Sequence, residues 1–305
     1  MCGLFGVIRS ERDRQPQGTA AVFAALGRMA ERRGQDAAGF AVVDRTGVGR
    51  VVKATRPFGR LWVSGHAQAV SDAHVVLGHT RHATDGAADV LANAAPLMVG
   101  GGLVGTHNGQ VDTGHLRASL PAGLAAPRGQ TDSEVLLLAL DRAGYDLDAV
   151  CQVLSAMRGP SALAWADPRR AGCVYLGRGA LCPLALATDL AGSLWWASSP
   201  AWFRHVDRWA DGQLGFQVER VREGTLLALE AGEQPAVVAE REFVPVARPG
   251  DEERFPSIWA GLDPEDVAAF RAEARYLVAA AGGPAQARRD PPRGGRIPLA
   301  ARPEP

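Results

Sequence analysis

Long hydrophobic runs are missing from this sequence of 305 residues. No segment reaches the roughly 18 consecutive apolar residues that a membrane-spanning helix requires, so we expect no transmembrane helix. The N-terminus also lacks a basic region followed by a long apolar segment, since residues 9–14 are strongly polar, and we expect no signal peptide. The formal net charge is zero, which offers no electrostatic attraction for nucleic acid or an anionic membrane. We therefore expect a cytoplasmic protein that binds neither nucleic acid nor membranes.

Cysteine is scarce, with four residues in the whole chain. Their spacing matches neither a metal-binding motif nor a dense disulfide framework, so we expect no metal, no cofactor and a reducing compartment. Cys151, Cys173 and Cys182 lie in apolar runs and are expected to be buried thiols. Cys2 differs from them because it directly follows Met1.

Cys2 precedes residues 3–8, which are expected to form a short buried strand. Removal of Met1 would leave Cys2 with a thiol nucleophile and a free α-amine on the same residue. The α-amine of a peptide has a pKa near ~8, so part of it is unprotonated at neutral pH and can accept the thiol proton. The alternative is that Cys2 is simply a small residue after a methionine.

Hydrophobic residues make up 47% of the chain, enough to pack the core of one large domain or two small ones. A helical period begins at Thr19 and stops near Gly34, and a hairpin of two strands follows at 39–44 and 48–54. After residue 160 the period shortens. Six further strands are predicted at 161–167, 172–178, 183–187, 193–198, 215–221 and 224–230. The chain therefore combines helices with many short strands.

Two other predicted strands end in polar residues that suit ligand binding. The strand 74–79 ends just before Arg81 and Thr84, and an Arg near hydroxyl groups suits an anionic ligand because it binds carboxylates through two hydrogen bonds. The strand 103–107 runs into Asn108-Gly109, whose side-chain amide and backbone N–H can converge on one oxygen as an oxyanion hole. A surface arginine and a tight turn are the alternatives for these two sites.

Residues 131–134, Thr-Asp-Ser-Glu, open a predicted helix, and a second helix is predicted over 147–157. Thr131 and Glu134 match a capping box, in which each side chain bonds the backbone of the other. Asp132 has two possible roles, because its carboxylate can favour the positive end of the helix or hold a substrate ammonium group.

Five motifs follow one another along the chain: Cys2-Gly3, Arg33-Gly34-Gln35-Asp36-Ala37-Ala38-Gly39, Gly78-His79-Thr80-Arg81-x-Ala83-Thr84, His107-Asn108-Gly109 and Thr131-Asp132-Ser133-Glu134. Together they resemble the motifs of the class II glutamine amidotransferases, which belong to the N-terminal-nucleophile hydrolases. The resemblance covers roughly residues 2–240 and implies an α+β fold, a four-layer αββα sandwich of two mostly antiparallel sheets. The motif at 33–39 resembles the phosphoribosyl-pyrophosphate amidotransferases, while Asn93-Ala94-Ala95-Pro96 and the later strands are more similar to the glutaminase domain of glucosamine-6-phosphate synthase.

The resemblance implies a covalent reaction on glutamine. Cys2 would attack the side-chain amide, with its own α-amine acting as base and later as acid. Asn108 and Gly109 would stabilise the oxyanion, and Arg33 would lie beside the nucleophile and order the loop around it. A thioester would form, ammonia would leave, and water would release glutamate.

The same resemblance implies how the zwitterionic end of L-glutamine is held. Arg81 would bind its α-carboxylate, Asp132 its α-ammonium, and Thr84 would help to place this end. Two neighbouring residues depart from the family pattern. His82 stands where the family commonly has Trp or Tyr, which puts the gating of ammonia transfer in doubt. Asp85 stands where the glucosamine synthase branch has His, and an extra acid there could weaken glutamine binding unless it turns away.

The end of the chain is expected to be separate from this domain. We predict a glutaminase domain at 2–245, a linker at 246–262, an amphipathic helix at 263–281 and a disordered tail at 282–305. No segment after residue 245 resembles an ammonia-using domain. We therefore expect a glutaminase subunit that supplies ammonia to a separate synthase, for which the helix and tail are candidate docking elements. The alternatives are a stand-alone hydrolase of another γ-glutamyl amide and a non-catalytic scaffold.

Overall fold

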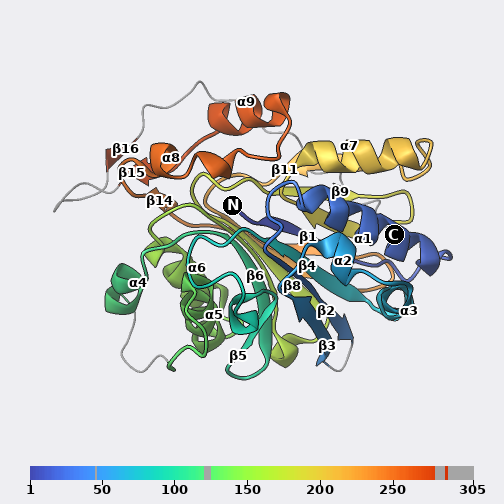
Figure 1. Cartoon of the computed structure of the whole chain (residues 1–305), viewed down its shortest axis with the longest axis horizontal. Helices are drawn as coiled ribbons and strands as arrows, with labels where there is room; N and C mark the ends of the chain where they lie inside the picture. The colour runs from blue at the N-terminus through green and yellow to red at the C-terminus, as the bar shows by residue number, and fades with distance from the viewer. Residues whose placement is uncertain (45–46, 120–124, 279–285, 288–305) are drawn as a thin grey trace.

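Two antiparallel sheets lie face to face in the computed structural model, and helices cover the outer face of each sheet (Figure 1). The structure describes residues 1–44, 47–119, 125–278 and 286–287. The predicted α+β class and two-sheet sandwich are confirmed. Within the described residues, no helix combines the length and the apolar character needed to cross a membrane.

The first sheet has seven strands in the order β11-β9-β10-β1-β4-β2-β3, with every neighbouring pair antiparallel. Its central strand β1 is buried on both faces, which explains why its sequence is continuously apolar rather than alternating. Because Cys2 immediately precedes β1, it is held at the end of the strand. The strands are β1 (Gly3–Ile8), β2 (Ala37–Asp44), β3 (Gly47–Ala54), β4 (Val75–Arg81), β9 (Ala185–Thr188), β10 (Leu194–Ala197) and β11 (Gln217–Arg220).

The second sheet has six strands in the order β13-β12-β8-β7-β6-β5. Two of them, β5 and β13, fall outside the predicted strands: β5 is very short, and β13 is largely exposed and charged, so neither shows a clear apolar pattern. The strands are β5 (Leu97–Val99), β6 (Leu103–Gly109), β7 (Ser161–Ala166), β8 (Cys173–Arg178), β12 (Thr225–Glu230) and β13 (Ala236–Glu242).

Helices form the two outer layers. The seven-stranded sheet is covered by α1 (Pro16–Ala30), α2 (Phe58–Leu61) and α7 (Pro200–Trp209), with α3 (Ser64–Asp72) packed beside α1. The six-stranded sheet is covered by α5 (Asp132–Ala143) and α6 (Leu147–Ala156), next to α4 (Thr113–Ser119). Short 3-10 helices are η1 (Leu91–Asn93), η2 (Pro168–Arg170) and η3 (Pro256–Ile258).

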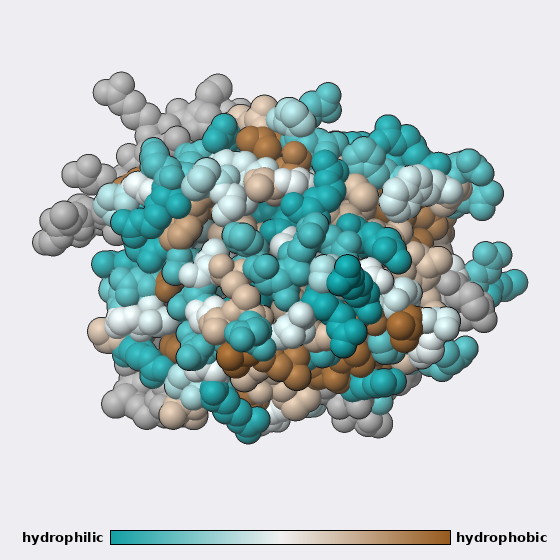
Figure 2. Space-filling model, viewed as in Figure 1, coloured by the Kyte–Doolittle hydropathy of each residue, from teal (hydrophilic) through white to brown (hydrophobic). Residues whose placement is uncertain are grey.

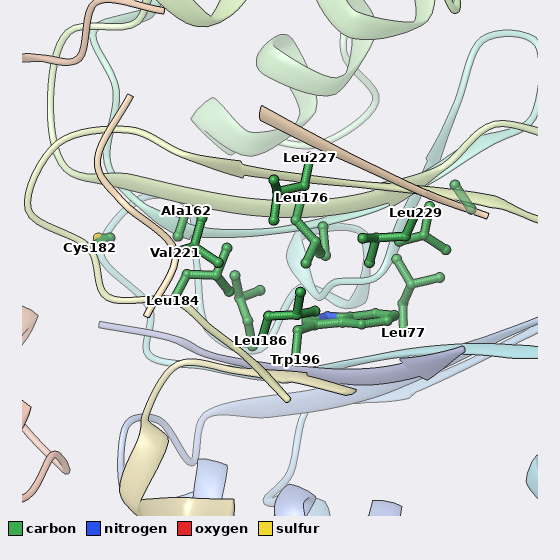
Figure 3. Close-up of a cluster of buried hydrophobic side chains, with 14 of the residues drawn as sticks. Leu77, Ala162, Leu176, Cys182, Leu184, Leu186, Trp196, Val221, Leu227 and Leu229 are labelled. Atoms are coloured by element: carbon green, nitrogen blue, oxygen red, sulfur yellow. The ribbon is translucent and has the colours of Figure 1, made fainter. Parts of the chain in front are cut away.

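The core lies in three layers, one between the sheets and one under each set of helices. Between the sheets, Leu176 and Leu227 of the six-stranded sheet point toward Leu186 and Trp196 of the other sheet (Figure 3). The molecular surface seen in Figure 2 is mostly hydrophilic, and hydrophobic residues gather in a band along the lower part of this face. Burial of the three apolar layers fixes the sheets relative to each other and thereby the strand ends that carry the polar motifs.

The segment after residue 245 packs onto the sandwich, which corrects the predicted linker at 246–262 and helix at 263–281. Ile258 and Phe270 are completely buried, and the helix α9 stops at Ala272. It is followed by β15, which pairs in parallel with β14. The elements are β14 (Val246–Ala247), α8 (Asp251–Arg254), η3, α9 (Pro264–Ala272), β15 (Leu277–Val278) and β16 (Gln286–Ala287).

Buried carboxylates explain this arrangement better than helical periodicity does. The Glu223 carboxylate accepts hydrogen bonds from the backbone N–H groups of Arg275 (2.6 Å) and Tyr276 (3.0 Å), which turns the chain away from the helix. In the first turn of α9, the Asp266 carboxylate accepts from the Ser199 hydroxyl at 2.6 Å. Apart from Gln286 and Ala287, the predicted disordered tail at 282–305 lies outside the described residues.

Candidate active site

Five separated parts of the chain meet around one pocket: the start of β1, the end of β4 with the loop after it, residues 93–97, the end of β6 and the start of α5. Of the predicted site residues, Cys2, Arg81, Thr84, Gly109 and Asp132 line this pocket. Asn108 lies directly before Gly109 in β6, whereas Arg33 does not line the pocket. The other lining residues are His79, His82, Asp85, Asn93, Ala95, Leu97, His107, Thr131 and Ser133.

Cys2 occupies the end of the pocket formed by β1 and is 8% exposed. Its thiol donates to the carbonyl oxygen of His82 at 3.7 Å. Burial raises the pKa of the Cys2 thiol, while the N-terminal amine and the Arg81 and Arg33 cations act in the opposite direction. Burial also lowers the pKa of the N-terminal amine of Met1, which favours its neutral, proton-accepting form. A base close to Cys2 is therefore needed to form the thiolate at neutral pH.

Arg33 holds the backbone around Cys2. Its guanidinium donates three hydrogen bonds to carbonyl oxygens: Nε to Cys2 at 2.7 Å, Nη1 to Ala260 at 2.9 Å and Nη2 to Ile258 at 2.9 Å. Burial lowers the pKa of Arg33 to about 10, which still leaves the group cationic at neutral pH. Arg33 lies beside Cys2, as predicted. Its guanidinium binds backbone carbonyl oxygens, two of which belong to the C-terminal segment.

Arg81 sits at the end of β4 and is 4% exposed. Its Nη2 donates to the carbonyl oxygens of Asp85 (2.7 Å) and Gly86 (2.9 Å), and its Nη1 donates to that of Ala87 (3.0 Å). The cation therefore folds the following loop around itself and brings Asp85 to the pocket wall. Thr84, in the same loop, is exposed and lines the pocket mouth.

The end of β6 brings an unusual backbone to the pocket that Cys2 also lines. Asn108 is completely buried, and neither atom of its side-chain amide has a hydrogen-bond partner in the part of the chain that the structure describes. Gly109 has a φ of 151°, and a Cβ atom there would lie 1.9 Å from the carbonyl oxygen of Pro160. Only glycine fits this position. A buried amide without a partner is costly unless a ligand or water meets it.

Asp132 is the first residue of α5 and is 4% exposed. Its Oδ2 accepts from the backbone N–H of Val111 at 2.7 Å and its Oδ1 accepts from that of Ser133 at 2.8 Å. Burial raises the pKa of Asp132 to about 6, and the charge of Asp85 adds to the increase. The carboxylate is therefore mostly ionised at neutral pH and can pair with a cation.

The predicted capping box of α5 does not form. The Glu134 carboxylate accepts from the backbone N–H groups of Arg128 (2.8 Å) and Gly129 (2.6 Å), outside the helix. Thr131, at the N-cap, makes no side-chain capping bond. The sequence pattern was correct for a helix start but wrong for the pairing, because Glu134 instead fixes the segment before the helix.

Two buried histidines that the sequence analysis did not assign complete the wall. The Nδ1 of His107 lies 3.0 Å from the Ser133 hydroxyl, and the Nε2 of His79 lies 3.1 Å from the carbonyl oxygen of His107. Burial lowers their pKa values to about 3 and about 4, respectively, so both rings are neutral at physiological pH. Their signal in the sequence was their position inside the motifs around Arg81 and Asn108.

His82 and Asp36 lie at the open side of the site. The Nδ1 of His82 is 3.7 Å from Oδ2 of Asp36, and its side chain is half exposed. The same Asp36 oxygen accepts from the backbone N–H of Ala83 at 2.7 Å, which fixes the turn after Arg81. Among the described residues, no group of three or more His, Cys, Asp or Glu side chains is placed to hold a metal ion.

Comparison with known proteins places this geometry in a family, although no family model matches the chain. The glutamine–fructose-6-phosphate aminotransferase (isomerizing) of Pyrobaculum aerophilum is 32% identical over 253 residues, which cover 80% of this chain and 38% of that enzyme. The chain thus spans less than half the length of this relative.

Two solved structures share the fold. A glutamine phosphoribosylpyrophosphate amidotransferase from B. subtilis, complexed with ADP and GMP, matches with a TM-score of 0.61 and 22% identity over 79% of this chain and 49% of that one. An allosteric regulatory enzyme of purine biosynthesis matches with a TM-score of 0.59 and 22% identity over 81% of this chain and 50% of that one. This chain is therefore a homologue of the class II glutamine amidotransferase domain.

Proposed function

We propose that this protein hydrolyses L-glutamine to glutamate through a thioester on Cys2 and supplies the ammonia to a separate synthase. One observation carries the proposal: a thiol, a cation and an anion from distant parts of the chain line a single pocket. L-Glutamine offers the matching groups, namely an electrophilic amide, an α-carboxylate and an α-ammonium. Cys2, Arg81 and Asp132 would meet them in that order.

The reaction begins with the loss of Met1, so that the α-amine belongs to Cys2. This amine accepts the thiol proton as sulfur adds to the amide carbon of glutamine. The Asn108 side-chain amide and the Gly109 N–H donate to the resulting oxyanion. The amine then returns the proton to nitrogen, ammonia leaves, and a thioester to Cys2 remains. Water adds to the thioester with the amine as base, and glutamate is released.

The names of two relatives bear on the use of the ammonia. The named relatives are an aminotransferase acting with glutamine and fructose 6-phosphate and an amidotransferase acting with glutamine and phosphoribosyl pyrophosphate. Both names describe transfer of glutamine nitrogen, and this chain matches only part of each protein. We propose that here too the ammonia is used in synthesis, with the acceptor bound by a different polypeptide.

Intact-mass analysis after labelling with 6-diazo-5-oxo-L-norleucine tests the glutaminase chemistry. The reagent resembles glutamine and alkylates the thiol that attacks it. We expect a single adduct on the wild-type protein, with Met1 absent, and no adduct on Cys2→Ala. Absence of an adduct on a folded wild-type protein, with and without candidate synthases, would contradict glutamine as the substrate. A panel of other γ-glutamyl amides, followed by glutamate release, would then test the stand-alone hydrolase.

A further inference from the structure

The start of α5 is capped by a residue from another part of the chain. The carboxylate of Asp85, in the loop after β4, accepts from the backbone N–H of Asp132 at 3.2 Å. The next helical N–H, that of Ser133, donates to Oδ1 of Asp132 at 2.8 Å. A threonine at the N-cap commonly accepts from this second or the third N–H of the helix. The Asp132 carboxylate has thus taken the Ser133 N–H, one of the two donors that Thr131 could otherwise use.

Thr131 is left with an unused hydroxyl in the wall of the pocket. Its residue is 6% exposed, and its Oγ1 has no hydrogen-bond partner within the residues that the structure describes. Thr131 lines the same pocket as Cys2, Arg81 and Asp132. A buried hydroxyl is normally paired, because leaving it unpaired forfeits its hydrogen bonds to water. The position of this one makes a ligand atom its natural partner.

We propose that Thr131 is a substrate-binding residue whose hydroxyl holds the α-amino-acid end of glutamine beside Asp132. The inference rests on the proposed glutaminase function and deepens its account of substrate recognition. A hydroxyl can accept a hydrogen bond from an ammonium group and donate one to a carboxylate. Thr131 can therefore serve the α-ammonium, the α-carboxylate or both.

The Thr131 hydroxyl differs from the neighbouring charged groups in its free hydrogen-bonding capacity. Both oxygens of Asp132 already accept backbone hydrogen bonds, and Arg81 already donates to three carbonyl oxygens of its own loop. Each charge thus has part of its bonding capacity committed to the protein. Thr131 adds a neutral group whose bonding capacity is uncommitted, so it contributes to ground-state binding of the substrate more than to the reaction at the amide.

Thr131→Val tests the proposal, because valine keeps the shape and removes the hydroxyl. We expect the KM for glutamine to rise about tenfold or more, with kcat changed by less than threefold, since a hydrogen bond to a charged group is worth at least this much. Thr131→Ser keeps the hydroxyl and should retain a KM close to that of the wild type. The thermal midpoint of Thr131→Val should not fall, because no capping bond is lost.

Thr106→Val is the matched control. Thr106 is a completely buried threonine in β6, but its hydroxyl donates to the carbonyl oxygen of Ala164 at 3.1 Å. Its replacement should lower the thermal midpoint and leave the KM unchanged, the reverse of the result expected for Thr131→Val. The two variants thus separate loss of a substrate contact from loss of an internal hydrogen bond.

The outcomes also separate this inference from the proposed function. An unchanged KM in Thr131→Val, on a protein whose wild type turns over glutamine, would overturn the role of Thr131 and leave the glutaminase intact. A lowered thermal midpoint with an unchanged KM would make Thr131 a structural residue. Failure of the wild type to release glutamate or to react with 6-diazo-5-oxo-L-norleucine would overturn both proposals together.

Discussion

Replacement of Gly109 by alanine should displace the Gly109 backbone N–H and thereby lower kcat. The ideal Cβ at this position lies 1.9 Å from the carbonyl oxygen of Pro160, and real Cβ contacts do not fall below 3.0 Å. The Cβ atom and the Pro160 oxygen must therefore move apart by about 1.1 Å. The Pro160 oxygen also accepts from the backbone N–H of Gln110 at 2.9 Å, so a shift endangers that hydrogen bond as well.

The magnitude follows from these contacts. Backbone strain at a φ of 151° costs about 1–3 kcal/mol for a residue with a Cβ, and a weakened hydrogen bond costs about 1 kcal/mol more. We therefore expect Gly109→Ala to lose about 2–4 kcal/mol of stability. Displacement of the Gly109 N–H from the oxyanion should lower kcat about 100- to 1,000-fold, the usual effect of losing one such donor.

Gly144→Ala provides the control, because Gly144 also has a positive φ (70°) but no atom within 4 Å of its Cβ position. It should lose stability through strain alone and keep the kcat of the wild type. Glutamate release and thermal unfolding of both variants are the measurements. Wild-type kcat in Gly109→Ala would refute the oxyanion assignment, and equal stability of the two variants would refute the proposed clash.

Three further predictions test other parts of the structure. The pKa of Asp132 is raised to about 6, so its ionised form, which pairs with an ammonium, predominates only above this pH. The kcat/KM for glutamine should therefore fall as the pH drops from 7 to 5, and a flat profile would contradict the pairing. Arg33→Met removes three hydrogen bonds to carbonyl oxygens, two of them buried, at about 1–3 kcal/mol for each buried one. Urea unfolding should therefore shift to lower concentration and thiol labelling of Cys2 should slow, and unchanged labelling would argue against positioning of the nucleophile. Phe270→Ala should lose about 3–5 kcal/mol in the same unfolding assay, whereas an α9 that served only to dock a partner would leave stability unchanged.

The sequence predicted the parts of the fold that depend on local pattern. Strand and helix positions followed from apolar periodicity, and the pocket residues stood at strand ends, where burial of the strand leaves the next residues to face an opening. The resemblance of the motifs around Cys2, Arg81 and Asp132 to those of one family then predicted that the three residues share a site.

What the sequence did not show depends on contacts between distant residues. The helix at 263–281 was too long because Glu223 bonds the backbone at residues 275 and 276. The capping box was wrong because the Glu134 carboxylate bonds the backbone N–H groups of residues 128 and 129, in the segment before the helix. In both cases a carboxylate meets backbone groups that the local pattern did not indicate.

The burial of Met1 has a consequence for the timing of maturation. Met1 is 1% exposed and packs in the core between the sheets. If Cys2 acts as the N-terminal nucleophile, a peptidase must first take this end of the chain into its own active site, which the closed fold prevents. Arg33, which bonds the Cys2 carbonyl, gains its bonds to residues 258 and 260 only after nearly the whole domain has been synthesised. Under that condition, processing would fall between emergence of the N-terminus and arrival of the C-terminal segment, and a chain that folded before losing Met1 would be trapped as an inactive precursor.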